Sequence, residues 1–145
     1  MSARSLVPFA ALAASLMAAA CEQADRGATE AADDLELGAP MAEVISAWRA
    51  ADLEVVELRD VDDDELPGAC VAASVAEIPV VLCELDSAEA AESAEDDGLE
   101  LVGAATGLAL ARGARLLIAA DRHEVDPDGR RLNEIANAFR QLDGN

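Results

Sequence analysis

Carboxylate side chains alternate with other residues just before a glycine near the end of the chain. Glu124, Asp126 and Asp128 occupy every second position, and a glycine follows. This spacing resembles the first half of a calcium-binding loop. The resemblance ends at Ile135, because a calcium loop has a bidentate glutamate at that place. A turn that caps the next helix accounts for the same residues. We therefore predict no resident metal or cofactor, with the three carboxylates as weak candidate ligands.

A second group of carboxylates forms an acidic run between residues 60 and 65. Hard cations bind clustered carboxylates. Solvated loops are also rich in these residues, and a turn signal, Pro67-Gly68, follows the run. We therefore expect an exposed loop, with a cation site as the alternative. The members of the run are Asp60, Asp62, Asp63, Asp64 and Glu65.

His123 is the only histidine, and it is the most obvious candidate for acid–base chemistry. A catalytic histidine needs a nucleophile and a group that orients its ring. Neither Ser74 nor Ser87 stands in the sequence of a nucleophile elbow. The glycines at 103 and 107 lack the lysine and the spacing of a phosphate-binding loop. These observations predict a protein that is not an enzyme, with a surface histidine.

The first twenty residues have the pattern of an export signal. Arg4 is the only charge before residue 21, and an apolar stretch follows from residue 6 to residue 17. That stretch is shorter than the roughly 20 residues that a membrane-spanning helix needs. Small residues then precede Cys21, as they do at cleavage sites. We predict that residues 1–20 are a signal peptide.

The end of this leader, in the sequence MSARSLVPFAALAASLMAAAC, resembles the lipobox of bacterial lipoproteins. The resemblance implies cleavage before Cys21 and acylation of that cysteine, with palmitate among the attached chains. Two or more acyl chains give stable anchoring. The implied location is the cell envelope, on a membrane and facing the periplasm, and Glu22 leaves inner and outer membrane both open. Ordinary signal cleavage, which would release a soluble protein, is the alternative, because Ala18 stands where a lipobox most often has leucine.

Three cysteines give the chain an odd number of thiols. Lipidation of Cys21 would remove one and leave Cys70 and Cys83 as a pair in an oxidising compartment. These two flank an expected hairpin turn at residues 76–78, which would place them nearly opposite each other. Their spacing does not fit a CxxC redox motif, so we predict a structural disulfide. Two buried thiols that only pack are the alternative.

The composition is strongly acidic. The 145 residues include 30 Asp and Glu against 10 Arg and no Lys, and the formal net charge is −20. Such a surface repels nucleic acids. Aromatic side chains that could stack on bases or sugars are scarce, because only Trp48 and Phe139 follow the leader and both fall on apolar helical faces. We therefore predict that the chain does not bind nucleic acid.

Behind the leader, the sequence divides into a tether and one folded domain. Residues 21–39 hold the cysteine and an acidic, alanine-rich stretch without a hydrophobic stripe, which predicts a flexible tether. Residues 40–145 have the length of a single domain. Its first helix should begin at Pro40, since apolar residues then recur at helical spacing as far as Trp48.

Strand and helix patterns alternate through the rest of this domain. A helix should run from about residue 86 and stop near Gly98, and a last helix should present a stripe from Leu132 to Phe139. Strands are expected at 54–59, 70–75 and 79–85, and in a hairpin formed by 99–111 and 115–120. This order predicts an α+β fold, in which an antiparallel sheet of about five strands carries helices packed on one face.

The segment from Ala69 to Phe139 is also similar to small uncharacterised lipoproteins of Gram-negative bacteria, and this resemblance implies no particular activity. It rests on Val81–Leu85 before an alanine-rich helix, Thr106-Gly107, Ala120–Arg122 and Asp126–Gly129. We therefore expect a non-catalytic, membrane-anchored envelope lipoprotein with a structural role or an envelope protein as partner. A periplasmic module that binds a divalent cation or a small ligand is the alternative.

Overall fold

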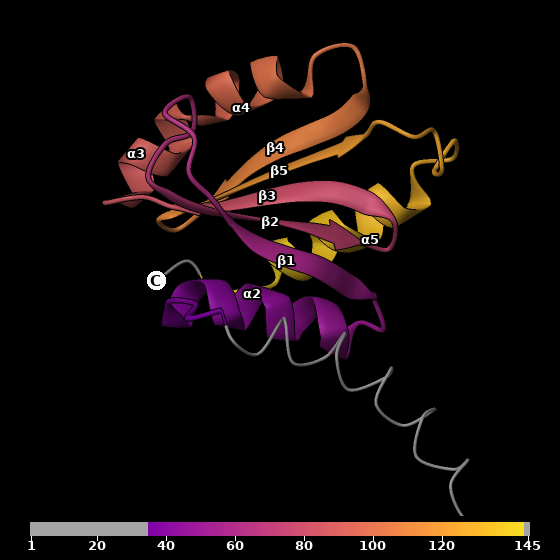
Figure 1. Ribbon diagram of the computed structural model, residues 1–145, viewed down its shortest axis with the longest axis horizontal. Coiled ribbons are helices and arrows are strands. Elements are labelled where there is room, and N and C mark those ends of the chain that lie inside the picture. Colours follow the sequence, from indigo (N-terminus) through magenta and orange to yellow (C-terminus); the bar gives the residue numbers. More distant parts are fainter. Residues whose placement is uncertain (1–34, 144–145) are drawn as a thin grey trace, which may run out of the picture.

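The computed structural model describes residues 35–143, which form a five-stranded antiparallel sheet with helices packed against it (Figure 1). The expected α+β class and the expected order of helices and strands are confirmed. The signal peptide, Cys21 and most of the tether lie outside the described residues. Leu35 and Leu37 pack against the hydrophobic core, ahead of the first described helix.

The sheet is built from a three-stranded antiparallel meander and a two-stranded hairpin. Its strands are β1 (Val55–Val61), β2 (Ala69–Val75), β3 (Ile78–Glu84), β4 (Thr106–Arg112) and β5 (Arg115–Asp121). Their order across the sheet is β1-β2-β3-β5-β4, and all neighbours are antiparallel. The β2–β3 turn consists of Ala76 and Glu77, whose φ angles are 48° and 68°. Two positive φ angles are typical of the tight turns whose twist matches that of a hairpin.

One layer of helices covers the lower face of the sheet in Figure 1. Helix α2 (Ala39–Ala50) and helix α5 (Arg130–Arg140) contact each other there. The indole Nε1 of Trp48 donates a hydrogen bond to the carbonyl of Ile135 at 3.1 Å, which joins the two helices inside the core. Both apolar stripes are buried as expected: Met41, Val44, Ile45 and Trp48 on α2, and Leu132, Ile135, Ala136 and Phe139 on α5.

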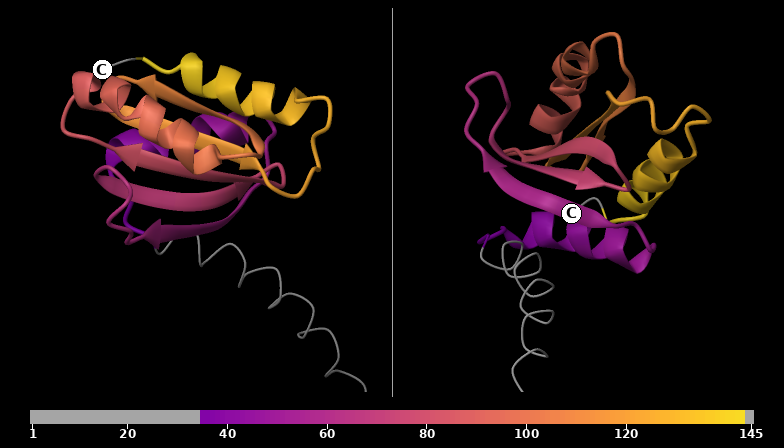
Figure 2. Two further views of the ribbon diagram at one scale, coloured as in Figure 1. Left: turned by 90° about the horizontal axis from the view of Figure 1, so that it is seen from above. Right: turned by 45° about the vertical axis from the view of Figure 1, so that its right-hand side comes forward.

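The other two helices contradict the expectation that all helices lie on one face. Helices α3 (Ala88–Ser93) and α4 (Glu95–Val102) pack on the opposite face, above the sheet in Figure 1 and clearly apart from α2 in Figure 2. The physical reason is β5, in which all seven residues are buried. Leu117 faces the α2–α5 side, and Ile118 faces the α4 side. A strand whose apolar residues point to both faces of the sheet needs cover on both faces.

The second helical segment is also longer than expected. Gly98 does not end it, because the helix continues to Val102 and ends at Gly103, where φ is 62°. Gly98 instead lies inside α4 and against the sheet, where an added Cβ would stand 2.9 Å from the Cβ of Ala109. The residue is a point of close helix–sheet approach. The following strand therefore begins at Thr106, and residues 99–102 are helical.

The cysteine pair forms the expected disulfide. Cys70 and Cys83 are direct partners in the β2–β3 register, and their sulfurs are bonded with Cα atoms 4.1 Å apart. Both residues are buried in the cluster beneath α4. The bond closes a short loop, since the two cysteines are 13 residues apart.

The disulfide should contribute measurably to stability. Replacing both cysteines in the variant Cys70→Ser/Cys83→Ser should lower the free energy of unfolding by about 3 kcal/mol, because the unfolded chain regains the entropy of the open loop. Urea denaturation under oxidising conditions measures this difference. A reductant should destabilise the parent protein and leave the double variant unchanged. Equal stability of parent and variant would contradict the prediction.

Candidate functional site

Asp126, a weak candidate for cation binding, instead caps helix α5. Its Oδ1 accepts a hydrogen bond from the amide of Arg131 at 3.1 Å, and its Oδ2 accepts one from the amide of Leu132 at 3.0 Å. These amides belong to the first turn of the helix, where backbone donors lack partners within the helix. The side chain is only 5% exposed. The contacts support the interpretation of this segment as a capping turn.

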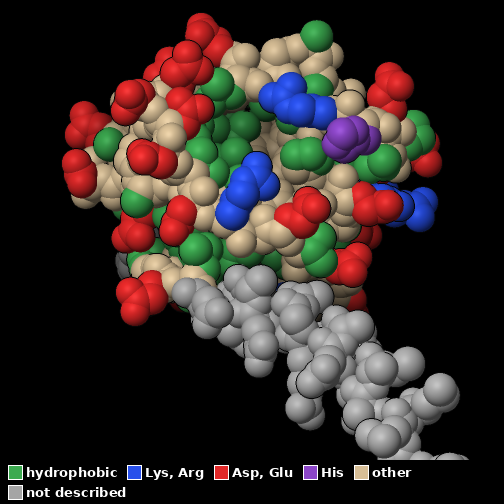
Figure 3. All heavy atoms as spheres, viewed as in Figure 1, with side chains coloured by type: hydrophobic (Ala, Val, Ile, Leu, Met, Phe, Trp, Pro, Cys, Tyr) green, Lys and Arg blue, Asp and Glu red, His purple; other side chains and the backbone are tan. Residues whose placement is uncertain are grey.

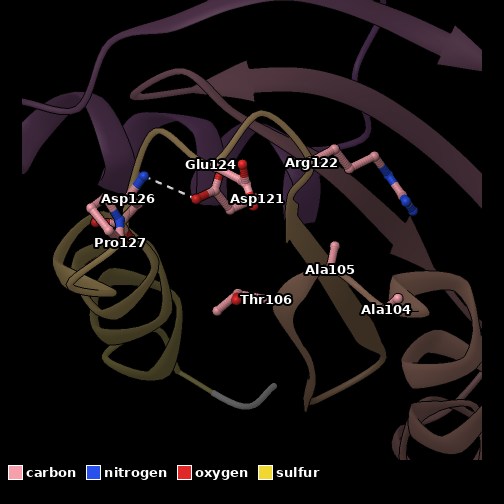
Figure 4. A pocket seen from close by; sticks show the side chains of 8 residues that line it. All are labelled: Ala104, Ala105, Thr106, Asp121, Arg122, Glu124, Asp126 and Pro127. Atoms are coloured by element: carbon pink, nitrogen blue, oxygen red, sulfur yellow. Dashed lines mark hydrogen bonds between the residues drawn. The ribbon is translucent and has the colours of Figure 1, made fainter.

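Asp121 holds the preceding segment in the same way. Its two carboxylate oxygens accept hydrogen bonds from the amides of Val125 at 3.0 Å and Asp126 at 2.9 Å. Figure 4 shows Asp121 and Asp126 joined by one of these bonds. Burial by itself would raise the pKa of Asp121, but hydrogen bonds from backbone amides, those of Asp126 and Val125 foremost, hold the pKa below its usual value.

The other carboxylates of the calcium-like segment do not complete a metal site. Glu124 and Asp128 are exposed. Glu124, Asp121 and Asp126 line a hollow of about 650 Å³ beside Thr106 (Figure 4). Within residues 35–143, no group of three or more His, Cys, Asp or Glu side chains is arranged to hold a metal ion. In the acidic run, Asp63 Oδ1 accepts a hydrogen bond from the amide of Glu65 at 3.0 Å, within a largely exposed loop.

His123 lies at the surface, as expected, and lines a hollow of about 260 Å³. Ser74 lines the same hollow, but no hydrogen bond joins His123 to any side chain in the described part of the chain. The second serine, Ser87, has a structural contact: its Oγ accepts a hydrogen bond from the amide of Ala90 at 3.1 Å at the start of α3.

A second hollow of about 240 Å³ adjoins the one beside His123 and is lined mainly by aliphatic side chains. The two share Arg59, Ala72, Pro79 and Val81, so they form one elongated depression. We call it the sheet groove. Figure 3 shows green hydrophobic surface in a hollow on this side of the molecule, with basic side chains and the histidine beside it. We call the second hollow the aliphatic half of the sheet groove. Its aliphatic lining residues are Val61, Leu66, Ala72, Pro79, Val81, Leu101, Ile118 and Ala120.

The strand register explains the floor of the sheet groove. Arg59 pairs with Ala72, Ala72 with Val81, and Val81 with Ile118. One row of neighbouring side chains therefore crosses four strands on the face that α4 shares. Helices α3 and α4 contact β4 and β5. The part of this face formed by β2 and β3 lies beside these helices and carries small side chains. The groove is this recessed part of the face.

Two arginines lie on the walls of the aliphatic half of the groove. Arg59 is exposed on β1, next to an irregularity in the β1–β2 pairing between Val56 and Arg59. Arg122 follows β5 and donates a hydrogen bond from its Nη2 to the carbonyl of Leu101 at 2.6 Å, which fixes the side chain against α4. Sequence reasoning missed both arginines. The only signal in the sequence was the position of each arginine, at or just after the end of a predicted strand in an acidic chain.

Searches of protein-family models, of curated proteins and of solved structures find no match to this chain.

The ionisation of Asp121 should make the stability of the folded protein depend on pH. Because its pKa is lower in the folded state, its contribution to stability is complete above its unfolded pKa, about 4, and is lost as the pH falls toward the lower folded value. Asp121→Asn should therefore reduce the melting temperature at about pH 7, and the difference from the parent should narrow below about pH 4. Thermal unfolding followed by circular dichroism measures both.

The matched control is Asp128→Asn, which removes an exposed carboxylate from the same connection. This variant should have the same melting temperature as the parent, both at about pH 7 and below about pH 4. A deficit of Asp121→Asn that stays constant through the acid range would contradict the prediction.

Proposed function

We propose that this protein is a non-catalytic lipoprotein of the bacterial cell envelope, anchored through Cys21 and facing the periplasm, whose domain binds a partner protein at the sheet groove. The groove is the observation that carries the binding role. It presents a contiguous set of aliphatic side chains on a chain that is otherwise acidic. Concave sites lined by apolar side chains, with a few polar groups at their edge, are common binding sites on folded domains.

The disulfide supports the proposed location. A bond between Cys70 and Cys83 is suited to an oxidising compartment and uses an even pair of cysteines. Cys21 is then the one thiol left over, as the resemblance of the leader to a lipobox implies. In the described part of the chain, no helix has the length and apolar character needed to cross a membrane.

The shape of the groove favours a partner's side chains over an enclosed small molecule. The groove is an elongated depression on a face of the sheet, with halves of about 260 and about 240 Å³. Pockets for small ligands instead enclose the ligand and bury most of its surface. A divalent cation is a poorer match, since the groove contains arginines and the carboxylates of Asp121 and Asp126 are engaged by backbone amides.

The anchor can be tested on the protein produced from its full gene in a Gram-negative host. Intact mass spectrometry should show a chain that begins at Cys21 and carries acyl chains, and the protein should remain with membranes after a high-salt wash. The variant Cys21→Ser should lose the acyl mass and appear in the soluble fraction. A parent protein with an unmodified Cys21 would overturn the proposed anchor.

The binding role can be tested by placing a photo-crosslinking residue at single positions in cells. A crosslinker at Leu66, on the rim of the groove, should give one discrete adduct with a protein. A crosslinker at Asn133, exposed on α5 and on the other face of the sheet, should give none. Adducts of equal yield at both positions, or at neither, would contradict a binding role for the groove.

A further inference from the structure

We infer that the sheet groove recognises an extended peptide segment in which an aspartate or glutamate lies next to an aliphatic residue. The inference rests on the proposed function and adds the chemistry of the partner. The carboxylate would bind between Arg59 and Arg122, and the aliphatic side chain would occupy the space between Leu66, Leu101 and Ile118.

Arg59 supplies the first half of the carboxylate site. It is exposed, and within residues 35–143 it has neither an ion pair nor a hydrogen bond through its side chain. Two of the described arginines do form ion pairs, since Arg115 binds Glu43 and Arg131 binds Glu77. An arginine that forms no ion pair among the described residues, at the edge of a hollow lined by aliphatic side chains, is available to a partner.

Arg122 supplies the second half, and it is already oriented. One Nη2–H group is used by the carbonyl of Leu101. A guanidinium has five N–H donors in a fixed plane, so others remain to bind a carboxylate. Because the Leu101 bond limits the rotamers of Arg122, less side-chain entropy is lost when a partner binds.

The distribution of charge favours an acidic partner at the aliphatic half of the groove. Asp63 also lines this half, so Arg59 and Arg122 leave it with one positive charge in excess. The other half of the groove is different, because Glu57 and Glu77 line it. The whole chain carries −20, and acidic side chains gather over the outer parts of the same view in Figure 3. An acidic segment is repelled by that surface and attracted at the aliphatic half of the groove, so charge determines where the segment binds and in which register.

The lining of the aliphatic half explains why the partner should carry an aliphatic residue. Val81 and Ile118 form the floor, and Leu66 from the β1–β2 connection and Leu101 from α4 also line this half. Among the described residues that line this half, none is aromatic. The site lies on the face of the sheet and not along its edge, so recognition depends on side chains and not on an added strand.

The experiment is a selection from short random peptides with both ends blocked, so that every carboxylate belongs to a side chain. The target is the full mature chain in detergent micelles. Selected peptides should carry Asp or Glu within two positions of Leu, Ile, Val or Met. A selected glutamate peptide should bind the parent protein about 5-fold more weakly after its Glu is changed to Gln. The unchanged peptide should bind the variant Arg59→Gln/Arg122→Gln more weakly by a similar factor. Added salt should weaken the parent complex.

The matched control is Arg49→Gln/Arg140→Gln, which removes the same charge from exposed positions on α2 and α5. This variant should bind the glutamate peptide with the affinity of the parent. Selection of peptides without acidic residues, or equal weakening in both double variants, would overturn the inference. Binding to vesicles of an anionic lipid, with no peptide selected, would also overturn it. The crosslinking experiment is independent of the arginines, so it can succeed while this inference fails.

Discussion

Strand β5 is buried on both of its faces, because its apolar side chains point alternately to the two sides of the sheet and all seven of its residues are buried. The lower face is covered by α2 and α5, and the upper face by α4. A single layer of helices would leave Leu116, Ile118 and Ala120 in water. The division of the helices between two layers follows from this one strand.

The same constraint fixes the two ends of β5. At its start, Arg115 is only 2% exposed, and its guanidinium donates to Glu43 at 3.1 Å and to the carbonyls of Pro40 and Asp143. A buried charge is tolerated only with such partners. At its end, Asp121 gathers the amides of the next turn, and Asp126 then caps α5. Buried carboxylates thus guide the chain from the strand into the helix.

The sheet groove is a consequence of how α4 packs. Gly98 lets the helix approach Ala109 and Ile118 closely, so its cover is concentrated over β4 and β5. The same face over β2 and β3 retains the small side chains Ala72 and Pro79. The scaffold that stabilises β5 and the depression that we propose as a binding site therefore share one helix.

Local patterns in the sequence determined the α+β class, the order of elements, the two apolar helical stripes and the register that joins Cys70 to Cys83. These depend on spacing of 3.6 or 2 residues and on turn residues, all of which act over short distances. Only the tertiary structure decided that helices cover both faces and that Gly98 lies inside a helix. It also decided that Arg59 and Arg122 border one groove. Each of these depends on which faces of distant segments meet, and neither residue type nor local spacing specifies that.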